Sequence, residues 1–333
     1  MAYRATLKDV AAAAGVSVTT VSLVLNNRPA RVSEEKRKAI ADAAKKLNYV
    51  PNQSARSLVT KQSQLVALIV PDIENLFFAA LAKCVEDECA AQGYSLIVAN
   101  SDDSRAAEHE LLQRLPARGV DGVMLIPARE SCVEQLCEDV ALVSCPVVLI
   151  DRLTQCGWCD AVGFDNYLGG RLAAQYLVEG GHTRIGIVTG DIAESSAAER
   201  RRGFVDAIEQ SGKHFDSSLC VEGDYRFDSG YRAANQIIDG GATAVFCCND
   251  VMALGFRQRM AERGLHVTED MQVIGYDNIL KRFGLGWRMT TVEQSVTDLA
   301  AACWGMLRKR IDVAVRAKSG TESGDARPWL SDP

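Results

Sequence analysis

The chain of 333 residues is 47% hydrophobic and 24% charged, which predicts two or three domains with sizeable cores. It has no run of ~18 consecutive apolar residues, as a membrane span requires, and its first residues lack the apolar stretch of a signal peptide. We therefore expect a cytoplasmic protein with no membrane partner.

The charge is distributed unevenly. Residues 1–61 carry 11 Lys and Arg against 4 Asp and Glu, whereas the remainder carries 26 against 39. A small basic segment joined to a large acidic body is typical of a phosphate-binding module attached to a part that does not itself bind DNA.

Residues 6–26 predict two short helices around a tight turn. Thr6 can cap the first helix, Gly15 suits the left-handed position that ends it, and Ser17 can cap the second. Apolar residues recur at helical spacing in both segments. This arrangement places a recognition helix in a DNA major groove, although any two-helix hairpin in a bundle would show the same pattern.

A third helix is predicted from Ser33 to about Lys46, which completes a helical domain over residues 1–48. Residues 49–63 form a linker, in which Pro51 ends the preceding element and only about two helical turns can follow. Isolated helices of fewer than ~12–15 residues are marginal in water, so we expect a hinge helix that forms only when it is supported. A plain tether is the alternative.

From residue 64, near-continuous apolar strands alternate with helices, which predicts parallel sheets covered on both faces. We expect strands at 65–70, 94–99, 121–126, 146–150, 160–164, 184–188, 219–222, 243–247, 272–275 and 291–294. The helices are expected at 77–92, 106–118, after 126, 167–180, 197–211, 229–239, 250–263 and 295–315.

This order predicts a core over 64–316 made of two doubly wound subdomains, 64–160 and 161–290, with the chain crossing back near 290. A cleft between them is the default ligand site. No G-x-G-x-x-G follows the first strand, and no P-loop motif occurs. The sequence therefore lacks the main motifs that indicate dinucleotide or nucleoside-triphosphate binding. Residues 317–333 are rich in Gly, Ser and charge, and we expect a disordered tail.

Eleven cysteines could indicate disulfides or a metal site. In a cytoplasmic chain of this length we expect them to stay reduced and to act as small apolar residues. Cys156 and Cys159 have the spacing of a redox motif, but they follow a strand instead of opening a helix, and no second pair completes a zinc site. We therefore predict no metal and no cofactor.

Ordered motifs along the chain resemble the LacI/GalR family of bacterial transcription repressors over residues 6 to about 316. The motifs are LKDVA at 7–11, AGVS at 14–17, TVSLVLN at 20–26, LNYVPN at 47–52, VDG at 120–122, IDR at 150–152, GH at 181–182 and IGYD at 274–277. The resemblance implies an all-α helix-turn-helix head, a hinge helix and a periplasmic-binding-protein-like α/β core that binds a small effector. It also implies a homodimer or tetramer that acts as a repressor on double-stranded, pseudo-palindromic operator DNA.

The resemblance places the base-reading positions on Val18, Thr19 and Leu23. The last is often Arg in relatives, and a leucine there can pack against a thymine methyl group but cannot make a bidentate guanine contact. Leu58 matches a hinge leucine that relatives wedge into a central minor-groove step. The full set assigned to DNA is Thr6, Ser17, Val18, Thr19, Thr20, Ser22, Leu23, Asn26, Tyr49, Asn52, Ala55, Arg56 and Leu58.

In the core, the residues that match effector-binding positions lie at or just past strand ends or early in a helix. They are Asp151, Arg200, Asn249 and Asp277, the aromatic pair Phe77 and Phe78, and the further candidates Arg152 and Tyr225. Carboxylates accept and guanidinium groups donate in pairs, which suits vicinal hydroxyls, so the expected effector is a sugar or a sugar phosphate. Helix packing remains the alternative for the two phenylalanines, and turn chemistry for Asp277.

Two other functional classes share part of this sequence pattern. A solute-binding protein for sugar uptake, with no DNA role, shares the core but does not explain the basic head. A sugar-modifying enzyme would need a nucleophile or metal constellation, and neither His182 nor His214 belongs to one. We therefore predict a protein that is not an enzyme.

Overall fold

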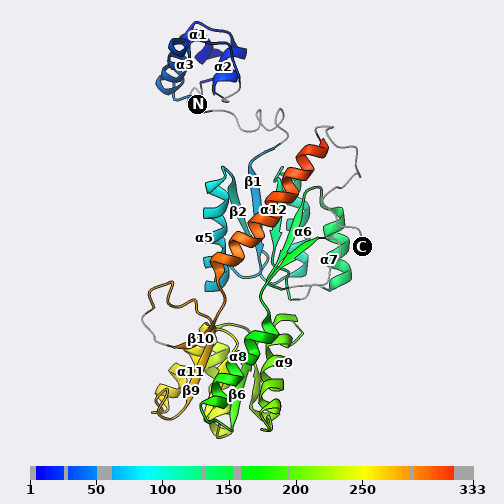
Figure 1. Cartoon of the computed structure of the whole chain (residues 1–333), viewed down its shortest axis with the longest axis vertical. Helices are drawn as coiled ribbons and strands as arrows, with labels where there is room; N and C mark the ends of the chain where they lie inside the picture. The colour runs from blue at the N-terminus through cyan, green and yellow to red at the C-terminus, as the bar shows by residue number, and fades with distance from the viewer. Residues whose placement is uncertain are drawn as a thin grey trace. The chain divides into compact units, whose positions relative to one another are not determined.

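The computed structural model describes residues 5–25, 29–50, 62–129, 132–152, 159–193, 195–285 and 289–318. It divides into two compact units, Met1–Ser63 and Gln64–Pro333, which we call the head and the core. Figure 1 shows a helical head and a core of two α/β lobes. No single described helix is long and apolar enough to cross a membrane; only the bent pair Leu7–Ala14 and Val18–Leu25 passes the length and composition test.

The head contains three helices, α1 (Leu7–Ala14), α2 (Val18–Leu25) and α3 (Glu34–Lys46). At the start of α1, Thr6 and Asp9 form a capping box, in which the Asp9 carboxylate accepts the Thr6 amide hydrogen at 2.7 Å. Gly15 ends the helix in the left-handed conformation with φ 63°. Ser17 and Ser33 cap the next two helices, each accepting a backbone N–H. The sequence therefore fixes the helix boundaries of the head by local capping.

The three helices share one small apolar cluster. Its buried members are Val10, Ala11, Val21, Ile40 and Ala43. So small a core buries little surface, which limits the stability of an isolated head.

The first lobe is a five-stranded parallel sheet in the order β2-β1-β3-β4-β5. Its strands are β1 (Leu65–Val70), β2 (Ser95–Asn100), β3 (Gly122–Leu125), β4 (Val147–Ile150) and β5 (Asp160–Val162). The helices that cover it are α5 (Leu76–Ala91), α6 (Arg105–Ala117), α7 (Val133–Leu142) and α12 (Val296–Lys318).

The second lobe is a five-stranded parallel sheet in the order β10-β9-β8-β6-β7. Its strands are β6 (Ile185–Thr189), β7 (Cys220–Glu222), β8 (Ala244–Cys247), β9 (Gln272–Asp277) and β10 (Thr290–Glu293). Its helices are α8 (Asn166–Glu179), α9 (Ser195–Gln210), η1 (Ser217–Leu219), α10 (Phe227–Asp239) and α11 (Asp250–Glu262). The two sheets confirm the predicted pair of doubly wound halves.

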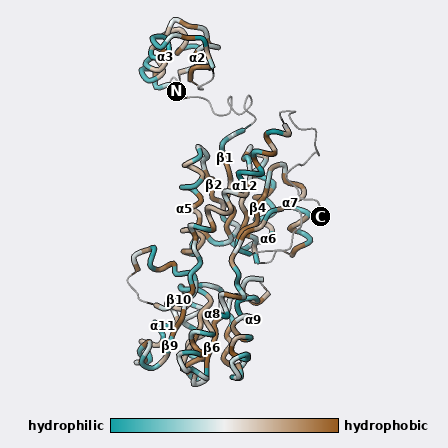
Figure 2. Tube along the Cα trace, viewed as in Figure 1, coloured by the Kyte–Doolittle hydropathy of each residue, from teal (hydrophilic) through white to brown (hydrophobic). Residues whose placement is uncertain are grey.

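The central strands of both sheets are hydrophobic and buried. Every residue of β3, β4, β6 and β8 is buried, and Figure 2 shows hydrophobic traces running through the middle of both lobes. Strands covered on both faces need no alternation of polar and apolar residues, which is why near-continuous apolar runs identify them in the sequence.

The last helix returns to the first lobe. After β10, α12 packs against α5, and its Trp304 and Leu307 belong to the apolar cluster of the first lobe. This helix extends to Lys318, so the prediction that the tail begins at residue 317 was wrong by two residues. Ala317 and Lys318 are good helix formers and simply continue the pattern. The predicted disorder of residues 319–333 lies outside the described residues.

Two helices of the second lobe cross unusually closely. A Cβ atom on Gly170 of α8 would lie 2.0 Å from the carbonyl oxygen of Arg200, and one on Gly203 of α9 would lie 2.0 Å from that of Tyr167. Only glycine permits this backbone approach. The crossing therefore fixes the position of α9 and, with it, of Arg200.

Candidate functional site

A cleft lies between the two lobes of the core. Its walls come from both lobes and carry aromatic, amide and charged side chains. The residues that line it are Asn75, Phe77, Phe78, Asp151, Arg152, Ser196, Arg200, Tyr225, Asn249, Asp277 and Gln294. All eight residues that the sequence assigned to the effector are therefore brought together in one place.

The strand ends explain this convergence. Phe77 and Phe78 begin the helix that follows β1, and Asp151 and Arg152 come directly after β4. The second lobe contributes residues that follow β6, β7, β8 and β10 in the same way, and Asp277, which is the last residue of β9. Because the carboxyl ends of parallel strands meet at one edge of a sheet, side chains far apart in the sequence face one cleft.

Arg200 is the charged centre of the cleft and is only 5% exposed. Its Nε donates to Asn166 Oδ1 and its Nη1 to the carbonyl oxygen of Cys248, both at 2.7 Å. The guanidinium lies 3.8 Å from the ring centroid of Tyr276, a cation–π contact. Burial opposes the charge, but Tyr276, Tyr225 and nearby carboxylates outweigh it and raise the pKa of Arg200 above its ordinary value.

Two buried carboxylates face this cation. Asp151 is 6% exposed and Asp277 is 7% exposed. Burial raises the pKa of both groups, and Arg200 only partly offsets it. Within the described part of the chain, Asp151 Oδ1 accepts no hydrogen bond. A ligand that donates a hydrogen bond to this oxygen would therefore stabilise the carboxylate.

Three cleft residues adopt the left-handed backbone region, which is uncommon for residues other than glycine. They are Asp151 with φ 64°, Tyr225 with φ 64° and Asp277 with φ 100°. Such conformations are held by the surrounding structure and concentrate at functional sites.

Asn249 and Arg152 are already engaged with protein groups. Asn249 caps α11 by accepting the Met252 amide hydrogen at 2.8 Å, and its Nδ2 donates to the carbonyl oxygen of Tyr225 at 2.8 Å. Arg152 Nη1 donates to Asp103 Oδ1 at 2.5 Å and to the carbonyl oxygen of Pro127 at 2.9 Å. Both residues line the cleft while holding its walls in place.

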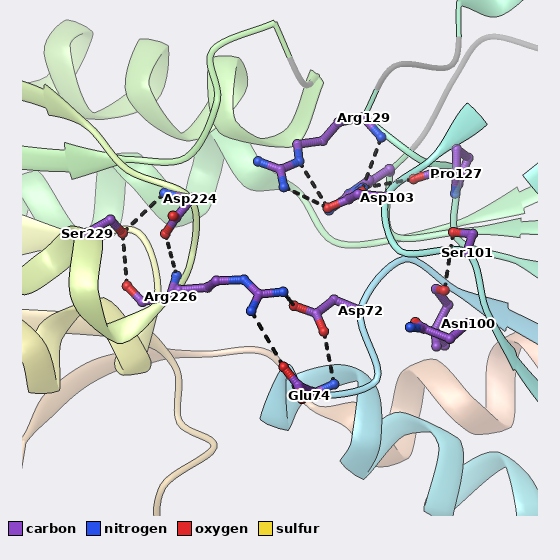
Figure 3. Close-up of polar contacts among 12 residues, drawn as sticks. Asp72, Glu74, Asn100, Ser101, Asp103, Pro127, Arg129, Asp224, Arg226 and Ser229 are labelled. Atoms are coloured by element: carbon purple, nitrogen blue, oxygen red, sulfur yellow. Dashed lines mark hydrogen bonds and ion pairs between the residues drawn. The ribbon is translucent and has the colours of Figure 1, made fainter. Parts of the chain in front are cut away.

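Asp103 anchors the first-lobe wall. Its carboxylate also pairs with Arg129, whose Nε donates to Asp103 Oδ2 at 3.0 Å (Figure 3). Burial alone would raise the pKa of Asp103, but Arg152 and Arg129 together bring it below its ordinary value. The carboxylate therefore stays ionised and keeps Arg152 fixed.

Three lining residues, Asn75, Ser196 and Gln294, were not predicted. Asn75 caps α5, where it accepts the Phe77 amide hydrogen at 3.0 Å, and this capping function is the feature that its sequence pattern suggests. Gln294 follows β10 and is 3% exposed. Its place after a strand end was the one signal that could have identified it.

The head presents apolar residues on the surface of α2. Val18 is 39% exposed, and neither it nor the half-buried Leu23 belongs to the apolar cluster of the head. Thr19 is exposed, and the hydroxyls of Ser17 and Thr20 lie 2.8 Å apart. These side chains are accessible for contact with base edges.

The remaining residues assigned to DNA have mixed positions. Thr6 caps α1, Ser22 is half-buried on α2, and Tyr49 packs against the head cluster. Five others lie outside the described residues: Asn26, Asn52, Ala55, Arg56 and Leu58.

The described cysteines and possible metal ligands have the following positions. In the described ranges, no group of three or more His, Cys, Asp or Glu side chains is placed to hold a metal ion. Cys156 of the C-x-x-C motif lies in the undescribed segment 153–158. Burial raises the pKa of the Cys248 and Cys303 thiols to about 12, which disfavours the reactive thiolate.

Comparison with known proteins gives a consistent result. Residues 6–52 match the family model of bacterial regulatory proteins of the lacI family, and residues 63–308 match that of periplasmic binding proteins and the sugar binding domain of the LacI family. The HTH-type transcriptional repressor PurR of Pasteurella multocida is 36% identical over 314 residues, covering 92% of each protein.

Solved structures of transcriptional regulators resemble this chain over almost its whole length. The Lac repressor dimer bound to operator and the anti-inducer ONPF superposes with a TM-score of 0.81 at 26% identity, covering 96% of this chain and 94% of that one. The complex of the transcriptional regulator CelR with cellobiose gives a TM-score of 0.69 at 30% identity, covering 93% and 94%. The chain belongs to the LacI family of bacterial regulatory proteins and is a DNA-binding repressor of that family.

Proposed function

We propose that this repressor binds a pseudo-palindromic operator as a homodimer, or as a tetramer, and is controlled by a neutral sugar bound between its lobes. The observation that carries the proposal is the buried carboxylate of Asp151, whose Oδ1 accepts no hydrogen bond from the described residues. A buried acceptor without a partner costs about 1–3 kcal/mol, so the cleft favours a ligand that donates hydrogen bonds.

The charges of the cleft favour a neutral ligand over a phosphate ester. Arg152 is paired with the Asp103 carboxylate, and Arg200, which donates to two neutral oxygens, is opposed by Asp151 and Asp277. When they are ionised, Asp151 and Asp277 repel a phosphate dianion. Of the two predicted effector classes, a neutral sugar therefore suits the cleft better than a sugar phosphate. CelR, solved with cellobiose, supports this class.

The aromatic lining suggests one competing class. Phe77 and Phe78 pack edge to face with ring centroids 5.6 Å apart, and Tyr225 lines the opposite lobe. Such walls can hold a sugar ring by its C–H face, but they can also stack on a planar nitrogen heterocycle. The ligand experiment below separates the two.

On the DNA side, Val18, Thr19 and Leu23 would contact base edges, and Leu58 would wedge into a central minor-groove step. Effector binding would change the angle between the lobes, which alters the support that the two hinge segments of a dimer give each other. We place the protein in the cytoplasm, where its operator lies. A solute-binding protein would share the cleft but would show no operator preference.

A thermal-shift screen of the full chain tests the effector class. The panel contains neutral mono- and disaccharides, their phosphate esters and purine bases at matched concentrations. We expect a neutral sugar to give the largest shift, and Asp277→Asn to abolish it. A larger shift with a phosphate ester or a base would overturn the neutral-sugar assignment.

A further inference from the structure

A set of ion pairs joins the two lobes beside the cleft. Arg226, at the start of α10 in the second lobe, places its Nη2 2.7 Å from Asp72 Oδ2 and its Nη1 3.5 Å from Glu74 Oε2. Both carboxylates belong to the turn between β1 and α5 in the first lobe. Figure 3 shows the Arg226 side chain reaching across to both. We call these three residues the lobe clasp.

Both ends of the clasp are held by their own turns. The Arg226 amide donates to Asp224 Oδ1 at 2.9 Å, and the Arg226 carbonyl oxygen accepts from Ser229 Oγ at 2.9 Å. On the other side, Asp72 Oδ1 accepts the Glu74 amide hydrogen at 3.0 Å. The Asp72 side chain is 20% exposed, so one partner is largely withdrawn from water. The ion pair is thus preorganised, which lowers the entropy lost in forming it.

The same two turns carry cleft residues. Tyr225 directly precedes Arg226, and its carbonyl oxygen is held by Asn249 Nδ2. Asn75 directly follows Glu74 and caps α5, whose second residue is Phe77. The clasp therefore connects a cleft-lining turn of one lobe to a cleft-lining turn of the other.

We propose that Arg226 is a positioning residue of the effector cleft, because its ion pairs with Asp72 and Glu74 hold the lobes together before any ligand binds. The inference that the clasp holds the lobes together depends only on these contacts. The inference that it changes effector affinity rests on the proposed function. A lobe arrangement that is already populated needs less free energy from the ligand, so effector affinity depends on the clasp.

Ionic strength should weaken the clasp. Arg226 is 58% exposed and Glu74 is 79% exposed, and salt screens exposed charges. An exposed pair of this kind is expected to shift the balance of closed and open forms by about two- to fivefold.

The test compares Arg226→Ala with Arg263→Ala in the full chain. Arg263 is the matched control, since its Nη2 lies 2.7 Å from Asp239 but both partners belong to the second lobe. Small-angle X-ray scattering measures the radius of gyration, and hydrogen exchange measures amide protection. A charge-swapped variant, Asp72→Arg with Arg226→Asp, tests for rescue.

We expect Arg226→Ala, and not Arg263→Ala, to increase the radius of gyration. It should also speed amide exchange about two- to fivefold in cleft segments 148–152 and 196–204, which lie outside the two turns that carry the clasp. In the unchanged protein, about 0.5 M salt should produce the same increase in radius of gyration and exchange rate. The charge-swapped variant should restore both quantities to those of the unchanged protein. Exchange that quickens only in 72–78 and 224–230, or an Arg226→Ala variant that matches Arg263→Ala, would overturn the proposal. Neither the scattering nor the exchange measurement requires a ligand. A sugar screen with no hit would therefore contradict the proposed effector but would not affect the conclusion about the clasp.

Discussion

Replacing Asp151 by Asn should have opposite effects on stability and on effector binding. The side chain is 6% exposed, its Oδ1 accepts no hydrogen bond from the described residues, and burial raises its pKa. Asparagine has the same shape and tolerates the left-handed backbone, here with φ 64°. The substitution therefore removes a buried charge without new strain.

The magnitude follows from the desolvated carboxylate. An unsatisfied buried group costs about 1–3 kcal/mol, and Arg200 and Arg152 offset part of this, so we expect about 1–2 kcal/mol of added stability at pH 7. For a core of this size that corresponds to an increase of roughly 2–6 °C in the melting temperature. Loss of a charged acceptor should weaken effector binding about tenfold or more.

The pH dependence gives the sign of the effect. Because burial raises the pKa of Asp151 in the folded protein, folding favours the neutral side chain. Its contribution to the free energy of unfolding is fully present below the pKa of an ordinary Asp and is lost as the pH rises through the folded-state pKa. The advantage of Asp151→Asn should therefore be largest at pH 7 and shrink as the pH falls toward about 4.

Calorimetry at several pH values measures this, with Asp139→Asn as the matched control. Asp139 is 8% exposed, but its carboxylate pairs with Arg105 at 2.5 Å and with His109 at 2.7 Å. We expect the control to lose about 1–3 kcal/mol. If Asp151→Asn lowers stability, or raises it equally at every pH, the argument from the buried Oδ1 without a hydrogen bond among the described residues is refuted.

Four further changes test other parts of the structure. Gly203→Ala should destabilise the core by about 3 kcal/mol or more in urea unfolding, because its Cβ would lie 2.0 Å from a carbonyl oxygen of α8. Gly305→Ala in α12 is its control and should add about 0.5–1 kcal/mol, since no atom lies within 4 Å of its Cβ. Thr6→Ala should cost the head about 1 kcal/mol by thermal melting, and an unchanged melt would exclude the capping role. Leu23→Arg should shift operator preference toward guanine in a binding-site selection, and an identical profile would reject Leu23 as a base reader. Leu58→Ala should weaken operator binding with effector affinity unchanged, and equal operator affinity would contradict the wedge.

Much of the fold could be predicted because the signals are local. Thr6, Gly15, Ser17 and Ser33 mark helix ends by chemistry that acts within a few residues, and apolar runs mark buried strands. The eight cleft residues converge because each lies at the carboxyl end of a parallel strand, just after it, or in the first turns of the next helix. That rule of sheet architecture needs no knowledge of side-chain contacts.

Other features depend on contacts between distant segments. Arg226 and Asp72 are 154 residues apart, and nothing in either local sequence indicates that the lobes bring them together. Gln294 lacks a distinctive motif, and Asn75 and Ser196 have side chains that caps and turns explain equally well. That Asp151 Oδ1 accepts no hydrogen bond from the described residues emerges only from the packed structure.

The most direct test of the account is fluorescence anisotropy of the full chain with candidate promoter duplexes and random duplex, with and without the sugar that stabilises it most. We predict that one pseudo-palindromic duplex is bound at least about 10³-fold more tightly than random DNA at physiological salt, and that the sugar changes this affinity. Equal affinity for every duplex, or an operator affinity that no cleft ligand alters, would contradict a ligand-controlled repressor.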